Sequence, residues 1–154
     1  DGEWAQKLAH PKYRVAKTYV ATLDKEMDHK VFEQLKHGVH LPDGKFVADR
    51  VYYPSKNNKR VVGLTIHSGK YRIIRRVFYR MGFDVKKLDR LFYGSLTLKN
   101  LPRGSWRVLS AKEIEQLTNP NAKSTVQDRS KWAKKKVLPR QSTRVKTKKV
   151  QAKK

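Results

Sequence analysis

Apolar and polar positions alternate over short stretches in the first two thirds of the chain, and this pattern predicts β-strands. Between residues 14 and 23 four apolar side chains share one parity, namely Val15, Tyr19, Ala21 and Leu23. Two threonines share the other, with Lys17 as an interruption, so we expect a strand with one solvent-exposed face. Further strands are expected over residues 46–53, 60–66, 85–93, 95–98 and 105–109. Residues 54–58 have the composition of a loop, which predicts that the strands on either side of them pair as an antiparallel hairpin.

Three stretches have helical spacing instead. Residues 72–81 are the clearest, because their five apolar side chains fall within an arc of about 140° on a helical wheel and Gly82 can end the helix. Arg75 lies about 60° beyond the edge of that arc, at the boundary between the apolar and polar sides. A second helix is expected over residues 30–37, before Gly38, and residues 110–113 have the Ser-x-x-Glu form of a capping box that begins a third.

The order of these elements indicates an α+β fold. The helices are too few and too scattered to alternate with strands in βαβ units, and the Pro-x-Gly sequences at residues 42–44 and 102–104 predict tight turns. We therefore expect one domain over residues 1–118, built on a mixed, mainly antiparallel sheet with a few flanking helices.

The charge of the chain is strongly positive and unevenly distributed. Its 154 residues contain 37 Lys and Arg against 13 Asp and Glu, a formal net charge of +24. Residues 119–154 hold 13 of those basic residues, one acidic residue and few apolar ones, so we expect them to form a disordered basic tail. Such a tail favours salt-sensitive binding to the phosphates of a nucleic acid, although a terminus that only increases solubility is the alternative.

Several kinds of chemistry are excluded by residues that the chain lacks. With no cysteine there is no disulfide framework, no cysteine-ligated zinc site and no thiol nucleophile. The common phosphate-binding, dinucleotide-binding, serine-hydrolase and zinc-protease motifs are missing, and the five histidines are too scattered to predict a metal site. No apolar run approaches the length of about 18 residues that a membrane span needs, so we expect no membrane association and a cytoplasmic location.

Basic and aromatic residues are interleaved at residues 70–72, 75–80 and 90–93. Arginine planes and aromatic faces suit the unstacked bases of single-stranded or distorted RNA. This pattern, with the net charge, predicts a nucleic-acid-binding protein, but it says nothing about a reaction.

A series of short motifs carries a family resemblance. In chain order they are Asp1-Gly2, Leu8-Ala9-His10-Pro11, Lys17-Thr18-Tyr19, Gly38-Val39-x-Leu41-x-Asp43-Gly44, Gly69-Lys70-Tyr71 with Arg75-Arg76, Leu88-x-Arg90-x-x-x-Gly94 and Leu101-x-x-Gly104-x-Trp106-Arg107-x-Leu109. In this order and spacing they resemble the RsuA-like family of ribosomal RNA pseudouridine synthases, from Asp1 to about Leu117.

The resemblance implies a fold, a reaction and a set of site residues. Members of the family isomerise a uridine that is flipped out of its stack, by breaking its N1–C1′ bond and joining C5 to C1′, and they need no cofactor or metal. Carried over by motif, the tyrosine that packs on the base is Tyr19, the basic partner of the catalytic aspartate is Arg75, and the packing leucine is Leu88. The expected contacts to ribosomal RNA are Lys17, Lys70, Arg72, Arg76 and Arg90.

The chain also departs from the family pattern. The Gly-Arg-Leu-Asp motif that carries the aspartate, and the S4 domain that usually precedes the catalytic domain, have no counterpart here. We therefore expect the chain to be the larger, C-terminal part of a catalytic domain, to lack the nucleophilic aspartate, to be inactive alone, and to be monomeric in the intact protein. Ile73 stands where many relatives have a polar residue.

Other interpretations of the same residues stay open. Tyr19 shares its parity with buried-type residues and is also compatible with a plain core position, and Arg75 with a solvated arginine. A noncatalytic RNA-binding or ribosome-assembly protein on the same fold is the main alternative function. A basic DNA-binding domain is a third.

Overall fold

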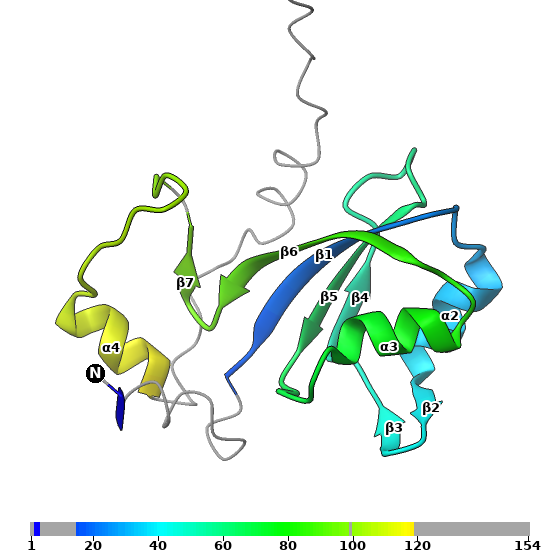
Figure 1. Ribbon diagram of the computed structural model, residues 1–154, viewed down its shortest axis with the longest axis horizontal. Helices are drawn as coiled ribbons and strands as arrows, with labels where there is room; N and C mark the ends of the chain where they lie inside the picture. The colour runs from blue at the N-terminus through cyan, green and yellow to red at the C-terminus, as the bar shows by residue number, and fades with distance from the viewer. Residues whose placement is uncertain (1, 4–14, 99, 119–154) are drawn as a thin grey trace, which may run out of the picture.

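The computed structural model describes residues 2–3, 15–98 and 100–118 of the chain. In order, the elements are β1 (Lys17–Leu23), α2 (His29–His37), β2 (Val39–Leu41), β3 (Gly44–Phe46), β4 (Arg50–Tyr52), β5 (Val61–Ile66), α3 (Ile73–Arg80), β6 (Val85–Tyr93), β7 (Leu96–Thr97) and α4 (Ala111–Thr118). Five strands form one sheet in the order β4-β5-β1-β6-β7, and β2 pairs with β3 (Figure 1). All strand pairs among these residues are antiparallel, which confirms the predicted α+β class.

Strand β1 lies at the centre of the sheet, between β5 and β6. Its Leu23 end lies beside the start of β5 and of β6, whereas Lys17, at its other end, is paired with Ile66 and Tyr93. Figure 1 shows α2, α3 and the β2–β3 hairpin gathered around the part of the sheet that holds β4 and β5, with β7 and α4 at the opposite end. The predicted tail, residues 119–154, lies outside the described residues.

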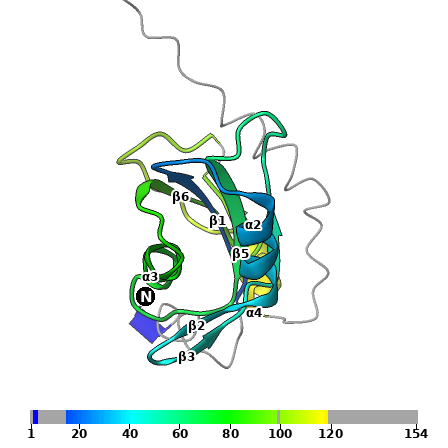
Figure 2. The ribbon, with the colours of Figure 1, turned by 90° about the vertical axis from the view of Figure 1, so that its right-hand side faces the viewer.

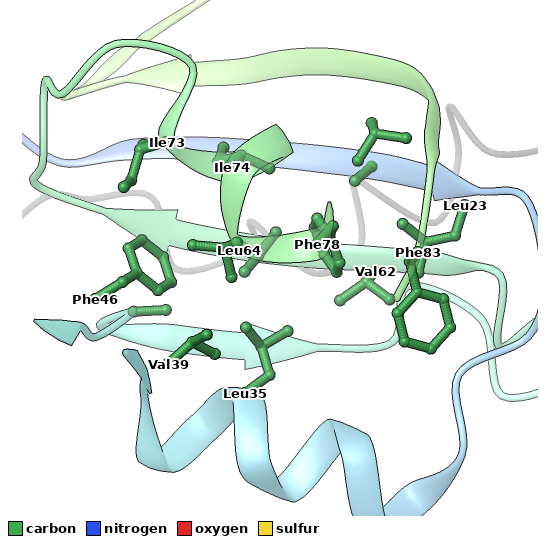
Figure 3. Packing of buried hydrophobic residues seen from close by; sticks show 14 of the residues in the cluster. Leu23, Leu35, Val39, Phe46, Val62, Leu64, Ile73, Ile74, Phe78 and Phe83 are labelled. Carbon is green, nitrogen blue, oxygen red and sulfur yellow. The ribbon is translucent and has the colours of Figure 1, made fainter. Parts of the chain in front are cut away.

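The main core lies between α3 and one face of the sheet. Figure 2 looks nearly along α3 and shows it on one side of the strands, and Figure 3 shows the side chains in between. Phe78 is fully buried, as the helical periodicity predicts, and burial of such a side chain stabilises the fold by about 1.5–3 kcal/mol. The helix contributes Ile73, Ile74, Val77 and Phe78, and the strands contribute Ala21, Leu23, Val62, Leu64 and Ile66.

Helix α2 and the hairpin after it complete this core. Phe32 is buried and stacks on Tyr53, with ring centroids 4.2 Å apart, while Leu35 is fully buried. The helix ends at Gly38, as predicted, where φ is +104° and a side chain would also strike the carbonyl oxygen of Phe46.

Three sequence-based predictions are wrong. The threonine face of β1 is not solvent-exposed, because Thr18 is fully buried and its hydroxyl is 3.1 Å from that of Thr65, which satisfies both polar groups. The strand expected over residues 46–53 is divided, since Phe46 ends β3 and β4 begins only at Arg50. Residues 105–109 form no strand, and no strand among the described residues pairs with them.

The predicted capping box at the start of α4 is confirmed. The backbone N–H of Ser110 donates to Glu113 Oε2 at 2.9 Å, and the Glu113 N–H donates to Ser110 Oγ at 3.3 Å. Arg107 also donates to this carboxylate. The bonds from Arg107 and Ser110 lower the pKa of Glu113 to about 2.

Candidate functional site

The pairing of β1 with β6 brings distant residues onto one face of the sheet. Lys17 and Tyr19 are two apart on β1 and so point to the same side. Their partners on β6 are Tyr93 and Arg90, which are three apart in the sequence. The register shifts between Thr18 and Tyr19, which adds one residue to β6, and this bulge places Tyr93 and Arg90 on the same face in spite of their odd spacing.

A cavity of about 340 Å³ opens on that face. Tyr19 and Leu88, both half-buried, line it from β1 and β6. The connection from β5 to α3 and the first turn of α3 close another side. Six of the residues singled out from the sequence line this cavity, namely Lys17, Tyr19, Lys70, Arg72, Leu88 and Arg90. Arg75 and Arg76 are not among its lining residues.

Two cations and an aromatic ring meet on the β1–β6 side of this cavity. Lys17 Nζ is 5.5 Å from the centre of the Tyr93 ring, and Arg90 Cζ is 5.1 Å from it. Lys17 is buried, with 9% of its surface exposed, whereas Arg90 is exposed. Burial, and secondarily the charge of Arg90, lower the pKa of the Lys17 ammonium group.

Arg75 and Arg76 are neighbours on α3 with different surroundings. Arg75 is half-buried, and its Nη1 donates to the carbonyl oxygen of Val85 at 2.6 Å. Within the described residues it makes no ion pair. Arg76 donates to both oxygens of Asp43, at 2.5 and 3.2 Å, in the turn between β2 and β3.

The same carboxylate also holds Lys70. Its Nζ donates to the Asp43 carbonyl oxygen at 2.7 Å and lies 3.3 Å from Oδ2. The hydrogen bond from Arg76, followed by that from Lys70, lowers the pKa of Asp43 to about 2. Two of the five residues predicted to contact RNA are therefore already paired with a carboxylate in this structure.

Arg72 adds a strained backbone at the edge of the cavity. It precedes α3 with φ +45° and ψ +31°, the left-handed region that non-glycine residues seldom adopt. Strained conformations cluster at functional sites, where the surrounding structure holds them in place. Arg72 lies beside Lys70 and Ile73 along the cavity wall.

Sequence reasoning missed two residues of this site. Tyr93 lies in the basic and aromatic run at residues 90–93, but the β6 bulge that turns it toward Lys17 has no counterpart in the sequence pattern. Asp43 was assigned only to a turn and a motif. It is 27 residues from Lys70 and 33 from Arg76, so no local pattern indicates the ion pairs.

A second and larger groove, of about 720 Å³, lies between β6, β7 and residues 101–109. Leucine and aromatic side chains line most of it, and Trp106 is 83% exposed. Tyr19 does not line this groove. The two share Leu88, Arg90 and Tyr93, but Lys17 and Tyr19 line the smaller cavity and not the groove, so the smaller cavity is the candidate functional site.

Two absences concern the described residues only. Residues 2–3, 15–98 and 100–118 include no helix long and apolar enough to cross a membrane. In these same ranges no three His, Cys, Asp or Glu side chains lie close enough together to hold a metal ion.

Comparisons with known proteins identify relatives of this chain. No protein-family model matches the chain. It is 38% identical over 120 residues to ribosomal large subunit pseudouridine synthase B of Bacillus subtilis, an alignment that covers 76% of this chain and 49% of the relative. It is 34% identical over 120 residues to an RNA pseudouridine synthase of Aquifex aeolicus, covering 76% and 47%. Over 76% of its length, this chain is a homologue of RNA pseudouridine synthases.

The structural comparison agrees. A crystal structure of a pseudouridylate synthase matches with a TM-score of 0.64 and 29% identity, over 76% of this chain and 51% of that one. The resemblance found from the sequence motifs is thereby confirmed. The chain spans about half the length of the curated relatives it matches. The roles of individual residues stay predictions.

Proposed function

We propose that this chain contributes the base-binding part of an active site that isomerises a uridine in ribosomal RNA to pseudouridine. The observation that carries the proposal is the shared cavity of Tyr19 and Leu88, in a chain 38% identical to a ribosomal large subunit pseudouridine synthase. The net charge of +24 supports an RNA partner.

In this proposal the cavity receives the flipped base. Tyr19 packs against one face of the uracil ring, and Leu88 shapes the space in which the ring turns between losing its N1–C1′ bond and gaining a C5–C1′ bond. The volume of about 340 Å³ is at the small end of the range for ligand pockets, which suits a single nucleotide. The reaction neither adds nor removes atoms overall, so the site needs to hold and orient the base without a second substrate.

We assign to Arg75 the role of pairing with an aspartate that lies outside this 154-residue sequence. Its guanidinium makes one hydrogen bond, to the Val85 carbonyl, and has no carboxylate partner among the described residues. A half-buried guanidinium in this state is suited to a carboxylate. Arg76 is a poorer choice because Asp43 already pairs with it.

A noncatalytic RNA-binding role is favoured by one observation. No aspartate or glutamate is among the described residues that line the cavity. Under this second candidate the protein binds RNA but converts no uridine. Under the proposed function the 154-residue chain alone is also inactive. The two candidates therefore differ only in whether the gene is needed for a pseudouridine in cellular ribosomal RNA.

The test is to map pseudouridines in ribosomal RNA from cells with and without the gene. The proposed function predicts at least one position that is pseudouridine only when the gene is present, and that returns with the native gene but not with a Tyr19→Ala variant. Tyr79→Ala, which changes an exposed tyrosine on α3, is the matched control and should restore it. Identical maps with and without the gene would favour the noncatalytic role.

A further inference from the structure

Lys17 is buried without an acidic partner. Only 9% of its surface is exposed, and neither an ion pair nor a hydrogen bond from its ammonium group occurs within the described residues. Charged groups that a protein withdraws from water are normally paired, because desolvation of an ammonium group is unfavourable. An unpaired buried lysine that lines a cavity therefore indicates a site for an anion that arrives from outside.

Arg90 places a second positive charge at the same point. Its guanidinium lies against the Tyr93 ring, as the Lys17 ammonium does, and it too has no carboxylate partner in the described part of the chain. The repulsion between the two cations adds to the burial that lowers the pKa of Lys17. An anion between them would relieve both effects.

The position of this pair relative to Tyr19 indicates which anion. Arg90 is the direct strand partner of Tyr19, so the two side chains are neighbours on one face. In every nucleotide a phosphate is attached to the same sugar as the base, so a phosphate accompanies any base that enters the cavity. Arg90 is exposed and accessible to RNA from solvent. Two other cations line the cavity. Lys70 is already held by Asp43, and Arg72 lies on the side formed by the start of α3.

We propose that Lys17, Arg90 and Tyr93 form a subsite for one phosphodiester group of the RNA, beside the cavity that takes the base. This inference rests on the proposed function for the identity of the RNA, and it deepens it by naming the part of the substrate that these residues bind. Arg90 contacts the phosphate oxygens through its fork of N–H donors, Lys17 contributes a point charge from within the cavity, and the Tyr93 ring holds both cations in place.

The experiment measures how binding of the full 154-residue chain to a 12-nucleotide oligouridylate depends on salt. The variants are Lys17→Met, Arg90→Gln and the double variant. The matched controls are Lys59→Met and Arg60→Gln, exposed residues at the opposite end of the sheet, next to the strand pair Thr22 and Val61. The double variant should bind more weakly and lower the slope of log K against log salt by about 0.7, the value for one phosphate of a single strand.

The melting temperature is a second readout, because replacing a lysine that only stabilises the fold would lower it. Lys17→Met should raise the melting temperature while it weakens RNA binding, because it removes an uncompensated buried charge and keeps the apolar stem. Arg90→Lys keeps the charge and should retain most of the salt slope. A folded double variant whose slope falls no more than that of the double control would overturn the proposal.

A result with one of the single variants would also overturn the proposal. If Lys17→Met leaves the RNA slope unchanged in this chain, the anion is not an RNA phosphate and the proposal is wrong. This failure is separable from failure of the proposed function, because the pseudouridine map is read in the cell and does not depend on the salt slope.

Discussion

Strands β1 and β6 are paired along almost their whole length, yet the side chains on one face of this pair differ between its two ends. At one end, Ala21, Leu23 and Val85 join the apolar core beneath α3. At the other end, Lys17 and Arg90 face a cavity. The difference arises because α3 begins only at Ile73, so the helix body covers the first end and its first turn forms only one wall of the second. One face of the sheet thus contributes to the core at one end and lines the candidate site at the other.

The largest effect is expected at the apolar end. Phe78→Ala should lower the free energy of unfolding by about 3–5 kcal/mol, because it removes a fully buried ring and leaves a cavity in its place. Chemical denaturation of the purified chain measures this. The neighbouring Tyr79→Ala, which truncates a side chain that is 82% exposed, should change stability by less than about 0.5 kcal/mol. Equal effects of the two variants would contradict the core described above.

For Arg75, which does not line the cavity and donates to the Val85 carbonyl, we expect a change in catalysis with little change in stability. In the intact protein, Arg75→Ala should lower kcat roughly 10²-fold, as misplacement of a reacting group does, with little effect on RNA affinity. Arg76→Ala is the control, since Asp43 already occupies its guanidinium, and it should retain most of the activity. Measured kcat and KM separate the two. Loss of activity in Arg76→Ala alone would mean that the two roles are exchanged.

On the opposite face of β1, the hydrogen-bonded hydroxyls of Thr18 and Thr65 can be tested by substitution. Thr18→Val leaves the hydroxyl of Thr65 buried without its partner and should cost about 1–3 kcal/mol. The double variant Thr18→Val and Thr65→Val removes both polar groups, so its loss of stability should be smaller than the sum of the losses in the two single variants. A double-mutant cycle measured by denaturation tests this, and strictly additive losses would show that the hydroxyls do not interact.

The smallest effect concerns the ion pairs at the edge of the site. The folded-state pKa of Asp43, about 2, lies below its unfolded value of 3.8, so these pairs stabilise the fold above the unfolded pKa. The contribution is lost as the pH falls through about 2. Unfolding curves at several pH values should show this loss in the native chain and not in Asp43→Asn. Asp89→Asn, at an exposed residue of β6 that makes no ion pair among the described residues, should behave like the native chain.

Local signals predicted much of the fold. The apolar arc of residues 72–81, the glycine after residue 37 and the capping box at residue 110 all depend on neighbours within a few positions, and each matches the structure. The strand at residues 105–109 and the exposed face of β1 were wrong because strand formation and burial depend on partners far along the chain. Thr18 is buried in the central strand, where it pairs with Thr65 and Phe92, and no local pattern could show these pairings.

The candidate site was predictable only in part, and for the same reason. The motif resemblance selected Tyr19 and Leu88, which share the cavity, but it gave no sign of the bulge in β6 that brings Tyr93 to Lys17. It also could not show that Asp43 occupies Lys70 and Arg76. Pairings across more than twenty residues are set by the fold, so charge patterns alone overestimate the number of cations available to RNA.

The most direct test is to measure pseudouridine formation and RNA binding together for the intact protein with Tyr19→Ala. If the cavity holds the target base, turnover should fall by roughly 10²-fold or more while RNA affinity changes only a few-fold, because the phosphate contacts are untouched. Full turnover by this variant would contradict the placement of the uracil ring against Tyr19.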